Sequence, residues 1–188
     1  MKRSVGAKTI AFPSPAWAIG TYDSEGKPNV MTAAWAGICC SRPPAMAVSL
    51  RKATYSYGNI VARGAYTISI PSEKYVREID RIGVVSGRDV DKFAELGLTA
   101  VRAEHVDAPY IEEFPVIIEC KVIHTIEIGL HTQFIGEVMD VKVDEDVLDE
   151  QGQPAAEKVK PFTFSMSDRT YHGIGELLGG AFSIGKEK

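Results

Sequence analysis

Apolar and polar side chains alternate along several segments of the chain, and such alternation is typical of half-buried β-strands. In the segment from Val116 to Ile126, Ile118 and Cys120 fall on one face, whereas Glu119 and Lys121 fall on the other. The same pattern, together with strand-forming composition, predicts strands at residues 16–22, 29–35, 46–50, 65–70, 116–126, 131–143 and 162–166.

Glycines and prolines mark where these strands turn or bend. Gly26 follows the first strand and can take the positive φ of a bulged hairpin turn. Pro43 and Pro44 fix the connection that leads into the third strand. Gly136 lies inside a strand, so it predicts a β-bulge or a point of close backbone approach.

Helices are predicted where apolar residues recur at helical rather than alternating spacing. The longest lies at residues 72–85, and shorter ones, each followed by a glycine, lie at 54–63 and 89–96. A helical turn is expected at residues 171–178. The charged segment 144–160 lacks apolar periodicity, so we expect it to be an exposed loop.

Strands that follow one another directly, with short helices between some of them, indicate a mainly β protein. We therefore expect an antiparallel barrel decorated by short helices. The 188 residues fit a single domain, which we place over residues 1–188. No GxGxxG motif opens a helix after a strand, so a doubly wound parallel sheet with a dinucleotide site has no support.

Charge and composition narrow the partners that we expect. The formal net charge is -4, which favours neither nucleic acid nor an anionic membrane, so a phosphate ligand would need a local basic site. The first ten residues carry Lys2, Arg3 and Lys8 but no continuous apolar run. We therefore expect no secretory signal and no membrane span, and a cytoplasmic protein.

The cysteines do not suggest a disulfide framework or a structural metal cluster. They are three in number and lack zinc-type spacing. Cys39 and Cys40 are neighbours, and neighbouring side chains on an extended segment point apart, so we interpret them as small apolar residues with reduced thiols.

The strand at residues 29–35 ends in small side chains where large β-branched ones are expected. Small residues let a planar ligand approach the backbone and use its N–H and C=O groups. A tightly packed barrel corner is the alternative explanation. The small residues are Thr32, Ala33 and Ala34, and Trp35 ends the candidate segment.

A second candidate segment joins the strand at 46–50 to the helix at 54–63. It places cations and hydroxyls at a helix N-terminus, where backbone amides favour a phosphate group. If Arg51 holds a phosphate, Arg51→Ala should weaken ligand binding by about 1.5–3 kcal/mol. A solvated basic loop is the alternative. The residues are Ser49, Leu50, Arg51, Lys52, Thr54, Tyr55 and Ser56.

Two further sites are suggested, one by a pair of residues and one by a single histidine. Ser86 and Gly87 precede the helix at 89–96, where their amides could meet a phosphate or the edge of a pyrimidine-like ring; alternatively, Ser86 or Asp89 only caps the helix. His131 begins a strand and could donate a hydrogen bond or move a proton beside a redox cofactor, although a lone histidine is usually structural.

Taken together in chain order, these segments resemble the flavin reductase-like family of FMN-binding split barrels, which includes flavoredoxins and archaeal ferric reductases. The resemblance extends from Ala16 to about Val143. It rests on the series 29–35 (NVMTAAW), 41–44 (SRPP), 49–56 (SLRKATYS), 64–66 (GAY), 86–93 (SGRDVDKF) and 131–137 (HTQFIGE).

The resemblance implies a split-barrel homodimer that holds one FMN per subunit non-covalently, at or near the subunit interface. The segment from Thr32 to Trp35 would line the isoalloxazine ring, and the segment from Ser49 to Ser56 would bind the phosphate and ribityl chain. His131 would lie near the flavin as the candidate catalytic residue. The residues that would close the pocket are Ser86, Gly87, Lys92 and Phe93.

The expected function is that of an FMN-dependent oxidoreductase. As an enzyme, it would accept hydride from NADH or NADPH and pass electrons to free flavin, a ferric complex or a partner protein. One alternative is a flavoredoxin-like electron carrier without a pyridine-nucleotide site, and another is a barrel-shaped interaction module without turnover. The extension after Lys160 departs from the family pattern and leaves the second substrate pocket undefined, with Tyr171 as a candidate to cover it.

Overall fold

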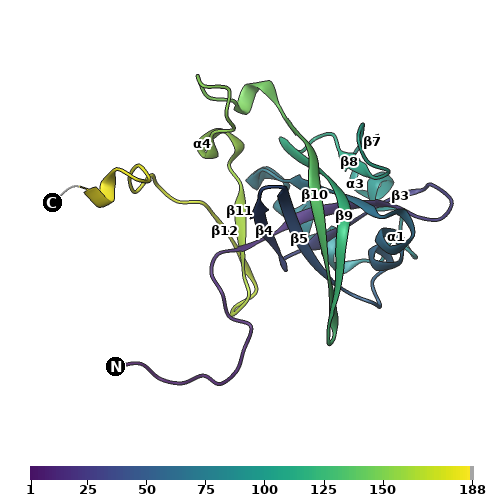
Figure 1. Cartoon of the computed structure of the whole chain (residues 1–188), viewed down its shortest axis with the longest axis horizontal. Coiled ribbons are helices and arrows are strands. Elements are labelled where there is room, and N and C mark those ends of the chain that lie inside the picture. The colour runs from purple at the N-terminus through teal and green to yellow at the C-terminus, as the bar shows by residue number, and fades with distance from the viewer. Residues whose placement is uncertain (187–188) are drawn as a thin grey trace.

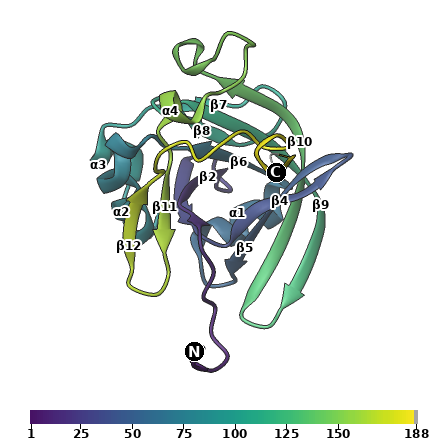
Figure 2. The same ribbon diagram turned by 90° about the vertical axis from the view of Figure 1, so that its left-hand side faces the viewer.

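The computed structural model describes residues 1–186, and its largest element is a seven-stranded antiparallel sheet with the strand order β3-β2-β6-β9-β10-β5-β4. The sheet curls into a barrel around a buried centre (Figures 1 and 2). Its strands are β2 (Trp17–Tyr22), β3 (Pro28–Ala33), β4 (Ala36–Ser41), β5 (Pro44–Arg51), β6 (Ala65–Ile70), β9 (Val116–Ile128) and β10 (His131–Val143).

Smaller elements surround this barrel. Two small sheets are formed by β1 (Ser14–Pro15), β11 (Phe162–Ser165) and β12 (Thr170–Gly173), and by β7 (Ala100–Arg102) and β8 (Pro109–Ile111). Among residues 1–186, no helix has both the length and the apolar character needed to cross a membrane. The helices are α1 (Tyr55–Arg63), α2 (Val76–Val84), α3 (Lys92–Leu96), α4 (Ala156–Val159) and the 3-10 helices η1 (Glu73–Tyr75), η2 (Glu145–Val147) and η3 (Ile184–Lys186).

The mainly β, antiparallel architecture expected from the sequence is confirmed, and each predicted strand is present with small shifts at its ends. The single domain over residues 1–188 stays a prediction, and its last two residues lie outside the described part of the chain.

One barrel strand was not predicted. Strand β4 lies at the edge of the sheet and pairs only with β5, so most of its side chains are exposed and no alternation marks it. Cys39 and Cys40 belong to this strand. All three cysteines are free, and Cys39 and Cys40 are both exposed.

The predicted helices are present with changes at their boundaries, and the one expected at residues 72–85 is divided into η1 and α2. Helix α1 ends at Gly64, which takes a left-handed φ of 63° as expected. Helix α3 is shorter than predicted and begins at Lys92, where the Asp91 carboxylate accepts a hydrogen bond from the Ala94 N–H. Ser86 and Asp89 instead lie in a preceding turn, so neither caps the helix.

The C-terminal part of the chain differs from the prediction. Residues 171–178 do not form a helical turn: β12 pairs with β11, and β11 also pairs with β1. The tertiary environment explains the change, because the ring of Tyr171 packs on those of Phe162 and Phe164. Figure 2 shows this hairpin beside α2.

The segment 144–160 is more ordered than the exposed loop that was predicted. It contains η2 and α4, and Val147 and Val159 pack with Val116 in a small buried cluster. Apolar residues so far apart in sequence give no periodic signal, and they become neighbours only in the folded chain.

Glu119 contradicts the face assignment of its strand. It was expected on the polar face, but it is 0% exposed. Its carboxylate accepts hydrogen bonds from the backbone N–H groups of Glu104 and His105, at 3.2 and 2.7 Å. The loop that covers this face is therefore attached through the carboxylate, which satisfies its oxygens without water.

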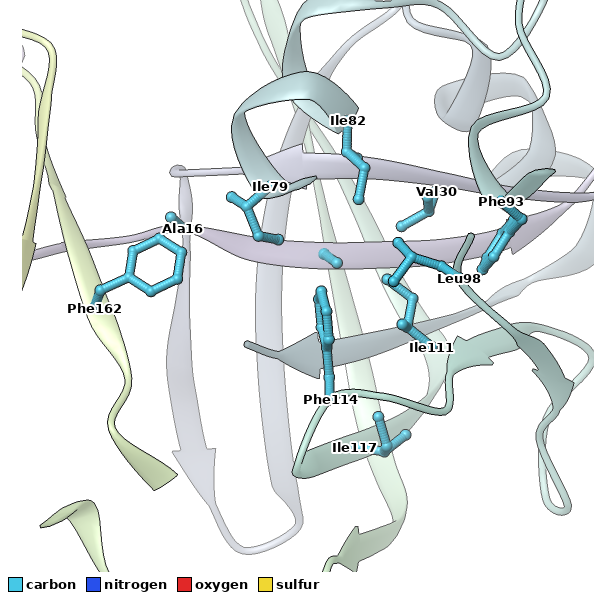
Figure 3. Packing of buried hydrophobic residues seen from close by; sticks show 11 residues of the cluster. Ala16, Val30, Ile79, Ile82, Phe93, Leu98, Ile111, Phe114, Ile117 and Phe162 are labelled. Atoms are coloured by element: carbon cyan, nitrogen blue, oxygen red, sulfur yellow. The ribbon is translucent and has the colours of Figure 1, made fainter. Parts of the chain in front are cut away.

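Two main hydrophobic clusters fix the elements that surround the cavities described below. One fills the barrel and includes Ile19, Leu50 and Phe134. The other lies between the outside of the sheet, α2, α3 and β11, and includes Ile79, Ile82, Phe93 and Phe162 (Figure 3). Because Ile79 and Ile82 are one turn apart and fully buried, α2 is held firmly against β3.

Candidate functional site

Two adjoining cavities open where the barrel meets α1, α2 and the β11–β12 hairpin. The first has a volume of about 400 Å³ and the second about 270 Å³. Thr54, Gly83 and Val84 line both, so the two cavities form one continuous depression. A depression of this size suits a small organic ligand or cofactor.

The first cavity gathers most of the residues that the sequence singled out. The end of β3 and the loop that follows provide small side chains on one wall, which leaves the backbone accessible. The Thr32 hydroxyl donates to the Ile79 carbonyl at 2.5 Å and so fixes this wall to α2. The predicted residues that line the cavity are Thr32, Ala33, Ala34, Trp35, Ser49, Leu50, Arg51, Thr54 and His131.

Trp35 and His131 form a stacked pair in this cavity. Their ring centroids lie 5.6 Å apart, with 19° between the ring planes. His131 begins β10 opposite Arg51 of β5, so both side chains project from the same face of the sheet. The imidazole therefore stands at the cavity wall, with its orientation restricted by the tryptophan.

The β11–β12 hairpin supplies cavity residues that the sequence analysis did not identify as a group. Phe164, Arg169 and Tyr171 line the first cavity together with Asp80 of α2. The Tyr171 hydroxyl donates to an Asp80 oxygen at 2.9 Å, and burial together with this carboxylate raises the pKa of Tyr171 to about 12. Tyr171 thus stays protonated and joins the hairpin to α2, and its suggested role in covering a second substrate pocket stays a prediction.

The second cavity lies between the start of α1 and the segment before α3. Of the predicted residues, Thr54, Tyr55, Ser56, Ser86, Gly87 and Lys92 line it. Arg88 lines it as well; its guanidinium lies over the Tyr55 ring at 5.3 Å and donates to the Ala53 carbonyl at 3.1 Å. Arg88 was not selected from the sequence, although the motif that contains it was.

Lys92 is a buried cation in the second cavity. It is 5% exposed, and its ammonium donates to the carbonyls of Val30 and Ile82, each at 2.8 Å. Within residues 1–186 no carboxylate forms an ion pair with it, and burial lowers its pKa from 10.5 to about 8. An anion in this cavity would stabilise the charged form.

Asn29 contributes a buried polar atom without a partner. Its amide nitrogen donates to the Ser56 hydroxyl at 2.9 Å, but its Oδ1 has no hydrogen-bond partner among the described residues. Gly87 lies against it so closely that a Cβ there would be 1.9 Å from Oδ1. Since buried polar atoms are normally satisfied, the unpaired oxygen suits a ligand that brings a donor.

Two predicted site residues are not brought to either cavity. Phe93 was expected to close the pocket, but its side chain belongs to the hydrophobic cluster beneath α2, because α3 turns this face inward (Figure 3). Lys52 points away and pairs with Glu127 at 2.6 Å on the exposed β9–β10 ribbon. Arg51, expected at a phosphate, lines the first cavity only.

The comparisons with known proteins agree with this geometry. Residues 9–175 match the family model described as flavin reductase like domain. The chain belongs to the flavin reductase-like family. Flavoredoxin of Desulfovibrio vulgaris (Miyazaki F) is similar to this flavin reductase-like protein at 60% identity, with a TM-score of 0.95, covering 99% of this chain and 100% of that chain. Flavoredoxin from Methanosarcina acetivorans is 28% identical, with a TM-score of 0.92, covering 99% and 98%.

Curated relatives match a smaller part of the flavin reductase-like protein. A ferric-chelate reductase (NAD(P)H) of Archaeoglobus fulgidus is 27% identical over 130 residues, which are 68% of this chain and 75% of that protein. The chain spans 65% and 48% of the length of two uncharacterized proteins, from A. fulgidus and Aeropyrum pernix. The split-barrel fold and a flavin-related redox role follow from the family and its structural neighbours.

The described residues of this flavin reductase-like protein fit a flavin mononucleotide. A mostly apolar cavity beside Trp35 and His131 suits a planar ring, and the adjoining cavity contains two cations that suit a phosphate. The unpaired Oδ1 of Asn29 gives the second cavity an acceptor for a ligand hydroxyl or N–H. The volumes and the charge distribution therefore agree with one ligand that spans both cavities.

Proposed function

We propose that this protein is an FMN-dependent oxidoreductase that binds FMN non-covalently across the two cavities and passes electrons through it. The observation that supports the proposal best is the continuity of an apolar cavity with a cation-lined one at the N-terminus of α1. Backbone N–H groups at such a terminus, with Arg88 and Lys92, favour a phosphate dianion.

The protein's own residues bind and orient in this proposal, and the bound FMN supplies the electron and hydride transfer. The small side chains from Thr32 to Ala34 let backbone groups reach the ring edge. Trp35 holds the His131 imidazole in place at 5.6 Å, so that it can donate a hydrogen bond or move a proton at the ring. The β11–β12 hairpin forms the wall of the first cavity on the side of α2.

The electron donor distinguishes two candidate functions. In the first, NADH or NADPH reduces the bound FMN, and the similarity to a ferric-chelate reductase (NAD(P)H) favours it. In the second, the protein is a carrier without a pyridine-nucleotide site, and the 60% identity to a flavoredoxin along the whole chain favours it. Stopped-flow mixing of the FMN-loaded protein with NADH or NADPH decides between them, because a carrier would show no bleaching of the flavin on a useful timescale.

A homodimer is part of the proposal. Ile126 and Ile128 pair with Gln133 and His131 and project from the same face of the sheet as His131, and they are 44% and 55% exposed. This apolar surface is continuous with the first cavity, to which His131 belongs. A second copy of the chain placed there would bury it and would close the cavity on its open side.

The position of the phosphate gives a direct test of the binding proposal. Arg88→Ala should weaken FMN affinity by about 1.5–3 kcal/mol, or roughly 10- to 100-fold, because a charge-assisted contact is lost. Arg51→Ala is the matched control and should have a smaller effect, since Arg51 lines only the other cavity. Quenching of FMN fluorescence measures both affinities. A larger loss in Arg51→Ala would place the phosphate in the first cavity, and wild-type protein that does not quench FMN would contradict the proposed function.

A further inference from the structure

The charged residues around the two cavities are mostly positive, although the net charge of the protein is -4. Arg51 and Arg169 line the first cavity, and Arg88 and Lys92 line the second. Asp80 is the one acidic residue that lines the first cavity, and no acidic residue is among those that line the second. Within residues 1–186, none of these cations forms an ion pair with a carboxylate. The cavities therefore form a local positive region.

Arg169 is held at the wall of the first cavity by the shape of its hairpin. Its φ is 59°, a left-handed conformation that is uncommon for a residue other than glycine. The turn is closed by the hydrogen bond from the Arg169 N–H to the Ser165 carbonyl at 2.9 Å. Such a conformation at a non-glycine residue persists because the surrounding structure of the turn maintains it.

The hairpin that carries Arg169 is fixed relative to α2. The hydrogen bond between Tyr171 and Asp80 joins the two elements, and the Tyr171 ring packs on Phe162 and Phe164. Asp80 thereby has a neutral partner of its own. Arg169 thus lines the first cavity from a hairpin that is attached to α2, and its exposed side chain is accessible to a ligand.

The inference rests on the proposed function. With the FMN phosphate in the second cavity, its charge is matched by Arg88 and Lys92, and the first cavity has two arginines but only one carboxylate among its lining residues, that of Asp80. We propose that the second reactant of the bound flavin is a small anion carrying a carboxylate or phosphate group, and that Arg169 binds this group and determines the preference for it. A guanidinium suits this task because its planar set of donors matches both kinds of anion.

Oxidation of the reduced protein tests the proposal without any assumption about the electron donor. FMN-loaded protein is reduced with dithionite, freed of excess reductant and mixed anaerobically with ferric–EDTA or with hexaammineruthenium(III). Each fully reduced FMN gives two electrons to two metal ions and releases two protons. Arg169→Glu should slow oxidation by the anionic chelate about tenfold at low salt and should not slow oxidation by the cationic complex, because only the anion is attracted to the cavity.

Salt dependence and two further variants complete the experiment. Oxidation by ferric–EDTA should slow as ionic strength rises in the wild type, and this dependence should weaken in Arg169→Glu. Arg169→Lys should recover part of the rate. Arg102→Glu makes the same change in net charge on β7, which contributes no residue to either cavity, and should leave both rates near those of the wild type.

A second experiment shows whether the electron acceptor or the electron donor carries the anionic group. In it, NADH or NADPH reduces the FMN-loaded variants. If Arg169→Glu slows only the reaction with ferric–EDTA, Arg169 binds a carboxylate-bearing acceptor. If it slows only reduction by NADH or NADPH, Arg169 binds the phosphates of the donor. Equal slowing with both metal complexes, an equal effect of Arg102→Glu, or no effect in either arm would overturn the proposal. FMN titration of the wild type is read separately, so failure to bind FMN would count against the proposed function instead.

Discussion

Lys92 shows how a single buried charge can couple ligand binding to pH. Burial lowers its pKa from 10.5 to about 8, so the folded protein without ligand loses this proton while the unfolded chain still keeps it. The unfolded state binds more protons between these two values, and the contribution of Lys92 to stability therefore rises as the pH rises from about 8 to about 10.5. A phosphate beside the ammonium would favour the charged form and reverse part of this shift.

We therefore expect FMN binding to become weaker as the pH rises above the pKa of Lys92. The dissociation constant should increase by up to about tenfold per pH unit, because binding must then take up a proton. Fluorescence quenching from about pH 7 to about pH 9.5 measures this slope. Lys92→Met should bind more weakly but without the slope, and riboflavin, which lacks the phosphate, should show none with either protein. The same slope for riboflavin would contradict the assignment.

At the residue scale, sequence reasoning found the parts of the site that are local in the chain. Thr32 to Trp35, Thr54 to Ser56 and Ser86 to Gly87 each form a short segment with its own chemical signature, and each segment lies at a cavity. Arg169 and Tyr171 were not identified as cavity-lining residues on this basis, because their place depends on the packing of a hairpin against α2. Phe93 was misjudged because only the orientation of α3 decides that it faces the core.

At the scale of elements, Gly136 of β10 lies opposite a β-bulge in β9, at a point where two motifs of the family series meet. The register between β9 and β10 shifts at Gly136, and a Cβ there would lie 2.7 Å from the Tyr66 hydroxyl and 2.8 Å from the Cys120 Cβ. Tyr66 is fully buried, and its hydroxyl donates to the Met46 carbonyl at 2.9 Å. Gly136 was predicted to mark a bulge or a close approach, and the structure has both.

Gly136→Ala should therefore lower the free energy of unfolding by about 1–3 kcal/mol, the usual effect of overpacking a close-packed core. Gly58→Ala is the control: this glycine lies inside α1, and an added Cβ meets nothing within 4 Å. It should stabilise the protein by about 0.5–1 kcal/mol, because alanine is the better helix former. Denaturant unfolding of both variants measures the difference, and an unchanged Gly136→Ala midpoint would show that Tyr66 moves aside freely.

Elements were predictable where one face is buried and the other exposed. Strand β10 and helix α2 have this asymmetry, and their patterns identified them. Edge strand β4 exposes most of its side chains, and β12 is short and owes its conformation to pairing with β11. Neither has a local pattern that separates it from a turn or a loop, so their places come from tertiary pairing alone.

At the scale of the whole molecule, the outer face of the β9–β10 ribbon is the surface that would form the interface of the proposed homodimer. Ile126 and Ile128 are exposed there, beside the residues that line the first cavity, and Leu130 is exposed in the turn between the two strands. A continuous apolar surface at a cavity mouth is more typical of an interface than of a solvated face. The register of β5, β9 and β10 fixes which side chains share this face, and this register was not accessible from single segments.

Ile126→Glu should convert the proposed dimer to monomers, because burying an unpaired carboxylate at the interface costs several kcal/mol. Val61→Glu, an equivalent change at a residue of α1 that is 58% exposed, should leave the dimer intact. Sedimentation velocity measures both. If the second copy also closes the first cavity, the Ile126→Glu monomer should bind FMN more weakly than the Val61→Glu dimer. A monomeric wild type would contradict the assembly, and unchanged FMN affinity in the Ile126→Glu monomer would show that one chain forms the binding site by itself.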